Sequence, residues 1–261
     1  MNIKKWEVAP LNRERAAQIA ERYSLPFFLS MLLEIRGFED EEEIRDLLSG
    51  GRLSNPLLMK DMDKAVERIR RAIDQFEKIA VYGDYDADGV TATSILFTYL
   101  EAVGADVIYY IPQREGEGYG MNLHAVEILH EEGVSLIITV DNGIASVAEV
   151  ARAKELGMDV VVTDHHRPQR EIPEAYAVVD AYQADDHGPY KDLSGAGVAL
   201  KLVMALEDGD AGSVLEEYAD LAALGTVADV VPVLGENRAI VKAGLNILSR
   251  GGRAGVDALL E

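Results

Sequence analysis

Three carboxylates stand at alternate positions directly after a short apolar run, in the sequence Val-Tyr-Gly-Asp-Tyr-Asp-Ala-Asp-Gly of residues 81–89. They are Asp84, Asp86 and Asp88. Three like charges within a few residues repel one another unless cations neutralise them. Hard divalent ions prefer oxygen-rich sites of this kind, so the cluster predicts metal binding.

Three other segments supply further ligand types. In Asp164-His165-His166, adjacent histidines can place one imidazole on a metal and the other toward a substrate. In the segment 141–143, the carboxylate of Asp141 precedes a turn-forming Asn-Gly pair and could bridge two ions. Asp229 is the one acid in the apolar stretch 225–232, where an unpaired charge would be costly to bury, so we expect it to contact a cation or a backbone cap.

Alternating strand and helix patterns predict the elements that must bring these residues together. Apolar runs separated by amphipathic stretches indicate an α/β fold, with a parallel five-stranded sheet and crossover helices. The predicted strands are residues 79–82, 107–111, 136–140, 160–163 and 177–179, and the predicted crossover helices are 91–103, 123–132 and 146–156. Four strands end directly at acids: Asp84, Asp141, Asp164 and Asp180. Because ligands of open α/β sheets lie beyond the carboxyl ends of the strands, we expect a site at this edge.

Helical patterns flank the α/β region on both sides. The N-terminal segment 1–55 is predicted to be helical over residues 12–23, 26–35 and 40–48, and a Gly-Gly pair at 50–51 and Ser-Asn-Pro at 54–56 mark a linker. Residues 56–190, with an amphipathic helix at 63–76, would form the α/β catalytic domain. Residues 191–261 would complete it with helices at 198–207, 213–224 and 238–248.

The composition narrows the chemistry further. A chain of 261 residues with 48% hydrophobic and 27% charged residues is typical of a globular protein that buries a substantial core. No apolar run is long enough to span a bilayer, and no apolar signal core follows the first six residues, so a cytoplasmic location and no membrane partner are expected. Cysteine is absent, so any metal must be held by Asp, Glu or His.

The formal net charge of −21 opposes the basic footprint of most nucleic-acid-binding proteins. Four explanations fit this charge: a small substrate, a local basic patch combined with bound metals, a basic DNA-binding module outside this chain, or an acidic surface that serves only solubility or adaptation to salt.

Taken in order, the motifs resemble those of the DHH phosphoesterase superfamily. The four motifs are residues 84–89, 141–143, 164–166 and 225–229. The flanking segments 111–114, 118–120 and 194–198 resemble its RecJ branch, the single-strand-specific 5′-to-3′ DNA exonucleases, and the similarity runs from about residue 60 to residue 248. The helical N-terminal segment also resembles that branch.

The resemblance implies a two-metal phosphodiesterase, with manganese preferred and magnesium as a competitor. One ion would be held by Asp86 and Asp141 with help from Asp84, and the other by Asp88, Asp141, His165 and Asp229. Two such ions activate water against phosphorus, so no side-chain nucleophile is needed. The remaining predicted roles are contact with the scissile phosphate for His166 and orientation of the histidine pair for Asp164.

Substrate contacts are predicted on the flanking segments. Arg114, Arg167 and the backbone amides near Gly195 and Gly197 are candidates to hold phosphates, although a Gly-x-Gly before a helix also suits plain packing or capping. Tyr119 could stack on a base or belong to the core.

RecJ proteins continue into a DHHA1 domain and an oligonucleotide-binding barrel, and neither is visible in this sequence. A catalytic core with a weak grip on single-stranded DNA is therefore expected. Two other functions stay open: a phosphoesterase acting on short oligonucleotides, cyclic dinucleotides or pyrophosphate, and a non-catalytic replication scaffold. Protein partners cannot be identified from the sequence.

Overall fold

The computed structural model describes residues 7–38 and 40–260, so the N-terminal residues used in the signal-peptide argument lie outside it. The chain divides into two compact units, with the division between Gly50 and Gly51. We describe each unit by itself. Within the described residues, no helix combines the length and apolar character that crossing a membrane requires.

In its described residues, the first unit contains three helices: α1 (Arg13–Tyr23), α2 (Phe27–Ile35) and α3 (Glu41–Ser49). The side chain of Asn12 caps α1, and that of Asp40 accepts hydrogen bonds from the first amides of α3. Both residues were predicted to open these helices. A small apolar cluster centred on Ile19, Leu33 and Ile44 holds the three helices together.

The second unit is built on a five-stranded parallel sheet in the order β2-β1-β3-β4-β5, which confirms the predicted fold class. Nearly every residue of the inner strands is buried, as expected for a parallel sheet covered on both faces. The strands are β1 (Ile79–Tyr82), β2 (Val107–Tyr110), β3 (Leu136–Val140), β4 (Asp159–Thr163) and β5 (Ala177–Val179). Their observed ends lie within one residue of the predicted ones.

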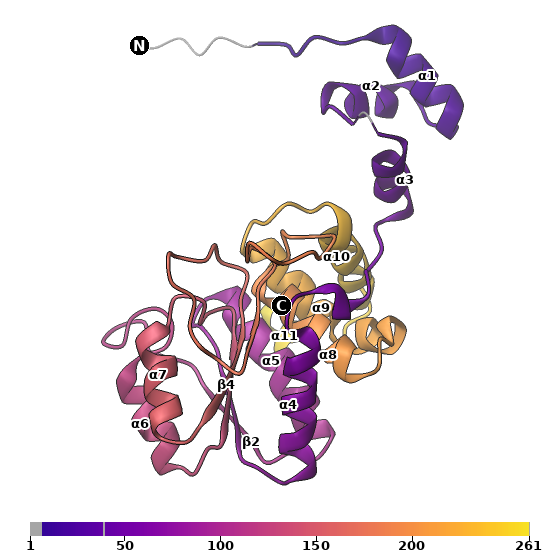
Figure 1. The fold of residues 1–261 in the computed structure, drawn as a ribbon. Coiled ribbons are helices and arrows are strands. Elements are labelled where there is room, and N and C mark those ends of the chain that lie inside the picture. Colours follow the sequence, from indigo (N-terminus) through magenta and orange to yellow (C-terminus); the bar gives the residue numbers. More distant parts are fainter. Residues whose placement is uncertain (1–6, 39, 261) are drawn as a thin grey trace, which may run out of the picture. The chain divides into compact units, whose positions relative to one another are not determined.

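Helices cover both faces of this sheet (Figure 1). Alternate strand residues point to opposite cores, so that Val81 and Ile138 belong to one cluster while Tyr82 and Ile137 belong to the other. The first core is covered by α4 (Met62–Asp74), α5 (Ala87–Ala102) and α8 (Gly195–Leu206), and the second by α6 (Leu123–Glu131) and α7 (Val147–Glu155).

Further helices complete the unit after α8. They are α9 (Ala211–Ala228), α10 (Gly235–Leu248) and α11 (Ala254–Leu260), and a short 3₁₀ turn, η1 (Pro56–Leu58), precedes α4. Helix α11 and η1 were not predicted from the sequence. Four predicted helices were too short by three or more residues at one end: α5 begins at Ala87 instead of 91, α8 at Gly195 instead of 198, α10 at Gly235 instead of 238, and α9 continues to Ala228 instead of ending at 224.

Side-chain caps explain the early starts of α5 and α8. Asp86 accepts a hydrogen bond from the amide of Gly89 at 2.9 Å, and Ser194 accepts one from Gly197 at 3.1 Å. Each is an N-cap that satisfies an otherwise unpaired helix amide. The glycines near these positions suggest loops in the sequence, but the caps make them helical.

We expect Gly244→Ala to destabilise the second unit. A Cβ at Gly244 of α10 would lie 2.2 Å from the carbonyl oxygen of Ala219 and 2.4 Å from the Cβ of Ala223, both in α9. Forcing the two helices apart should cost about 1–3 kcal/mol of unfolding free energy, measured by urea denaturation. Gly255→Ala in α11 is the control, because a Cβ there would meet nothing within 4 Å. An equal effect of the two substitutions would contradict close packing of α9 and α10.

Candidate metal centre

The candidate site lies at the carboxyl edge of the sheet, where the strand order changes direction. Strand β1 lies between β2 and β3, so the crossover connections leave it in opposite directions. Asp84 follows β1 and Asp141 follows β3. A crevice at such a switch point is the usual ligand position in an open α/β sheet.

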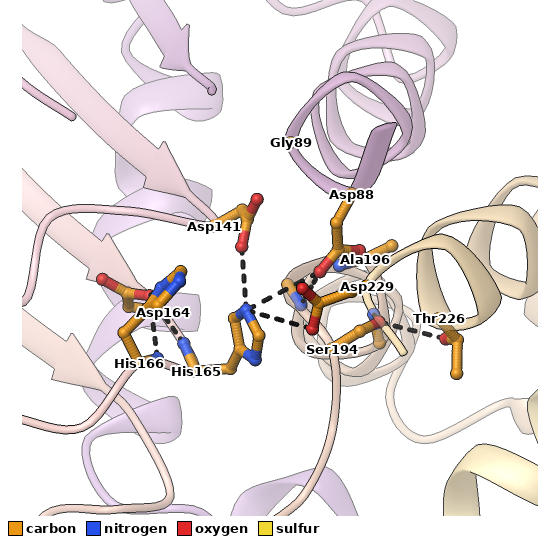
Figure 2. A network of polar contacts seen from close by, with 12 residues as sticks. Asp88, Gly89, Asp141, Asp164, His165, His166, Ser194, Ala196, Thr226 and Asp229 are labelled. Atoms are coloured by element: carbon orange, nitrogen blue, oxygen red, sulfur yellow. Dashed lines mark hydrogen bonds and ion pairs between the residues drawn. The ribbon is translucent and has the colours of Figure 1, made fainter. Parts of the chain in front are cut away.

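The imidazole of His165 is surrounded by three carboxylates (Figure 2). Its Nε2 lies 3.0 Å from Oδ1 of Asp141, 3.7 Å from Oδ2 of Asp88 and 3.8 Å from Oδ2 of Asp229. His165 follows the end of β4 and Asp141 follows the end of β3. Asp88 lies in the first turn of α5, and Asp229 is the C-cap of α9. Four distant segments therefore bring the ligand types of a divalent cation to one point.

A second group of acids shares Asp141 with the first. Single oxygens of Asp84, Asp86 and Asp141 lie within 4.8 Å of one another, as do ligand atoms of Asp88, His165 and Asp229. A third set of the same kind joins Asp141 to both histidines. Asp141 thus stands where one carboxylate could contact two ions.

Buried polar atoms without hydrogen-bond partners collect at this point. Both carboxylate oxygens of Asp84, Oδ1 of Asp141 and Nε2 of His165 are buried, and none makes a well-directed hydrogen bond. Leaving such groups unpartnered costs free energy, whereas divalent cations would pair with all of them. The residues present therefore fit a metal centre.

Burial also shifts the ionisation of these groups. It raises the pKa of Asp141 to about 8, and it raises the pKa values of Asp84 and Asp88. Burial alone would lower the pKa of His165, but the adjacent carboxylates of Asp141 and Asp88 raise it to about 9. A cation that binds here must therefore displace protons.

The Asn-Gly turn after β3 aims Asp141 into the site. Asp141 has a φ of 61°, a left-handed conformation that is uncommon for residues other than glycine. The side-chain amide of Asn142 donates to the carbonyl oxygens of Tyr82 at 3.2 Å and Val140 at 2.9 Å, which ties the turn to both β1 and β3. The Asn142 side chain therefore holds the Asp141 backbone in place.

Asp164 fixes both histidines. Its Oδ1 accepts the backbone amides of His165 at 2.7 Å and His166 at 3.1 Å, and it lies 2.8 Å from Nδ1 of His166. The hydrogen bond to Asp164 raises the pKa of His166. The side chain of His165 is 10% exposed and that of His166 is 45% exposed, so one ring lies inside the site and the other at its mouth.

The glycine amides predicted to hold phosphates have other partners. The amide of Gly195 donates to Oδ2 of Asp88 at 2.6 Å, that of Ala196 donates to Oδ1 at 2.9 Å, and that of Gly197 donates to the hydroxyl of Ser194. A phosphate contact by the Gly195 or Gly197 amide would have to replace one of these hydrogen bonds, and the phosphate-binding role of the two amides stays a prediction. The Ser-Gly-Ala-Gly pattern could have indicated the N-cap, but the contact with Asp88, 107 residues away, has no local signal.

The other predicted substrate-binding residues lie near the site. The guanidinium of Arg114 lies 5.4 Å from the ring centre of Tyr85, and that of Arg167 lies 4.4 Å from the ring centre of Tyr182. Tyr119 is 54% exposed, and its hydroxyl donates to the backbone oxygen of Asp141 at 3.2 Å. The same hydroxyl lies 3.2 Å from the ring nitrogens of His166. Tyr119 therefore contacts the site through its hydroxyl, and its stacking on a base stays a prediction.

A parallel sheet that gathers carboxylates and an imidazole at its carboxyl edge defines an α/β protein with a divalent-metal site. The family model described as "DHH family, N-terminal domain" matches residues 78–226, more than half of the chain. The chain therefore belongs to the DHH family.

Several similar proteins are named RecJ. The chain is 44% identical to the "Single-stranded-DNA-specific exonuclease RecJ" of Bacillus subtilis (strain 168), over 98% of this chain and 32% of that protein. It superposes on the RecJ of Thermus thermophilus in complex with Mn²⁺ with a TM-score of 0.80 and 34% identity, over 97% of this chain and 36% of that one. Another exonuclease RecJ bound to manganese gives a TM-score of 0.72 and 42% identity, over 80% and 53% of the two chains.

These matches show that the core is of the RecJ type. The chain spans about a third of the length of the curated Bacillus relative.

We expect Asp141→Asn to abolish high-affinity manganese binding without unfolding the chain. The amide keeps the size of the carboxylate and tolerates a positive φ, but it removes the charge shared by both acid groups. Isothermal titration calorimetry with Mn²⁺, with circular dichroism to verify the fold, measures the effect.

Asp180→Asn is the matched control. Asp180 is also a fully buried acid at a strand end, but it belongs to none of the metal-ligating groups found among the described residues. It should retain manganese binding. If Asp141→Asn binds manganese like the parent chain, Asp141 is not a metal ligand.

Proposed function

We propose that the chain is the catalytic core of a metal-dependent phosphodiesterase that hydrolyses single-stranded DNA from the 5′ end, in DNA repair or recombination. The observation that carries this proposal is the position of His165 Nε2, within 3.0–3.8 Å of carboxylate oxygens from three separate segments. Several proteins similar in sequence bear the name of single-stranded-DNA-specific exonucleases, and two similar RecJ structures are described as bound to manganese.

The proposed ligands divide into two sets that share one carboxylate. Asp88, Asp141, His165 and Asp229 would hold one ion, and Asp84, Asp86 and Asp141 the other. When bound, two divalent ions supply the positive charge that activates water and stabilises the charge developing on the phosphate and the leaving oxygen. The cysteine-free, mixed carboxylate and imidazole ligand set suits manganese, with magnesium as the competitor.

His166 is the proposed substrate-facing residue. Asp164 accepts the proton on Nδ1 of His166, which fixes the ring, and the exposed part of the ring can then contact a non-bridging phosphate oxygen. The buried ring of His165, by contrast, faces only carboxylates through its Nε2. The two adjacent histidines are therefore suited to different roles.

Two arginines are the proposed contacts for neighbouring phosphates. Arg114 lies over the ring of Tyr85, and Tyr85 stands in the sequence between the proposed ligands Asp84 and Asp86. Arg167 directly follows His166 in the sequence. Each guanidinium covers an aromatic ring, which limits its motion while leaving its N–H groups able to bind phosphate. The polarity of degradation enters the proposal through the resemblance alone, and a cytoplasmic location is also part of the proposal.

We expect manganese-dependent release of mononucleotides from single-stranded DNA labelled at its 5′ end. The substrates to compare are single-stranded DNA labelled at either end, duplex DNA, a dinucleotide, a cyclic dinucleotide and pyrophosphate, each with Mn²⁺ or Mg²⁺. Turnover of only the dinucleotide, the cyclic dinucleotide or pyrophosphate would contradict the exonuclease proposal and indicate a small-substrate phosphoesterase. No turnover of any substrate by a chain that binds manganese would favour the scaffold.

We expect His166→Ala to keep manganese affinity but to lower the rate by roughly 10²–10³-fold, the usual cost of removing one donor to a transition-state oxyanion. Calorimetry measures the affinity and the single-strand assay measures the rate. His130→Ala, at an exposed position of α6, is the control and should change neither. Lost manganese binding in His166→Ala would make His166 a ligand, consistent with its place beside Asp141 and His165 in the third group.

A further inference from the structure

The first turn of α8 contacts two of the proposed metal ligands. Its amides bind both oxygens of Asp88, at 2.6 and 2.9 Å. A Cβ at Gly195 would lie 2.4–2.6 Å from the side-chain atoms of Asp141, so only glycine lets the helix approach this closely. The first turn of α8 therefore packs directly against the carboxylates of both Asp88 and Asp141.

The same turn is joined to α9 by two hydroxyls. Oγ of Ser194 lies 3.0 Å from Oγ1 of Thr226, and both residues are fully buried (Figure 2). Oγ1 of Thr226 donates its hydrogen to the carbonyl oxygen of Ala222 at 2.7 Å. A hydroxyl has one hydrogen, so Ser194 must donate to Thr226 while accepting the amide hydrogen of Gly197. The hydrogen bonds form one directed chain from α8 to α9.

The last turn of α9 carries the third carboxylate. Thr226 stands three residues before Asp229, and the amide of Asp229 donates to the carbonyl oxygen of Gly225 at 2.9 Å. A Cβ at Gly225 would lie 2.5 Å from Oδ1 of Asp88. The end of α9 therefore lies directly against the carboxylate that α8 holds.

We propose that the Ser194–Thr226 hydroxyl bridge is a positioning pair for the metal centre. It fixes the first turn of α8, which holds Asp88, against the last turn of α9, which carries Asp229. The bridge thereby sets the separation of these two carboxylates around His165. This inference rests on the metal centre of the proposed function.

Helix capping alone does not account for the bridge. Ser194 caps α8 by accepting the amide hydrogen of Gly197, and this contact does not require the hydroxyl hydrogen. Thr226 satisfies its own hydroxyl hydrogen within α9. The remaining contact, Ser194 to Thr226, is the one that joins the two helices, so its removal leaves each helix intact while the two turns become free to separate.

The test is the manganese affinity of Thr226→Val and Ser194→Gly, measured by isothermal titration calorimetry on the full chain. Valine keeps the shape of threonine but also loses the bond to Ala222, and glycine is tolerated at an N-cap but also loses the bond from Gly197, so the bridge is the one contact that both variants remove. We expect the dissociation constant of the tighter manganese ion to rise roughly 10–100-fold in both, the usual effect of losing a group that orients a ligand. Thr226→Ser keeps the hydroxyl and should bind manganese like the parent chain.

Thr98→Val is the matched control. Its hydroxyl makes the same kind of bond within a helix, to the carbonyl oxygen of Ser94 at 2.6 Å in α5, but it does not touch the metal-ligating groups. Thr98 is less buried than Thr226, and its replacement should leave manganese affinity unchanged. An equal loss of affinity in Thr98→Val would show an effect of helix stability and overturn the inference.

The remaining outcomes separate the two proposals. Parent-like manganese affinity in folded Thr226→Val and Ser194→Gly would overturn the bridge and leave the metal centre standing. A parent chain that binds no manganese would overturn both. Should Thr226→Val fail to fold, Ser194→Gly decides the question, because it leaves the methyl packing of Thr226 in place.

Discussion

The rest of the second unit is arranged around one constraint, which is the burial of like-charged carboxylates beside one another. Asp84, Asp88 and Asp141 are each 1–2% exposed. Such groups resist burial unless hydrogen bonds or cations compensate them. Asp88 is compensated in part by two helix amides, whereas Asp84 has no hydrogen-bond partner at either oxygen. The buried carboxylates therefore carry negative charge that the protein compensates only in part and that divalent cations would neutralise.

Rigid elements make this concentration of charge possible. Strands β1, β3 and β4 are paired along their whole length, so the residues that follow them cannot separate to relieve repulsion. Helices complete the site from the other side, since Asp88 lies in the first turn of α5 and the amides that bind it open α8. The positive ends of both helices point at the carboxylates, which lowers the cost of burying them.

The strands and the identity of the acidic positions were predictable, whereas the contacts between distant turns were not. An apolar run such as residues 136–140 has a local signal, and Asp141 directly after it marks the strand end. The early start of α5 at Ala87 depends on a cap by Asp86. An aspartate at this position is equally common in a loop, so the sequence alone did not identify the cap. The hydrogen bond from Gly195 of α8 to Asp88 joins residues 107 positions apart, and the bridge from Ser194 to Thr226 joins residues 32 positions apart. No periodicity or propensity in the sequence indicates such pairs.

The same contacts explain how so acidic a chain can be suited to an anionic substrate. The formal charge of −21 counts every carboxylate as if it were free. In the proposed centre, however, five carboxylates share two divalent cations, which leaves one negative charge among these groups. Asp164, beside His166, adds one more negative charge, and Arg114 and Arg167, which lie over Tyr85 and Tyr182, balance the two. A phosphodiester that reaches the site would therefore meet a local charge close to zero instead of the charge of −21, because site electrostatics depend on the charges within about one Debye length and not on the total charge.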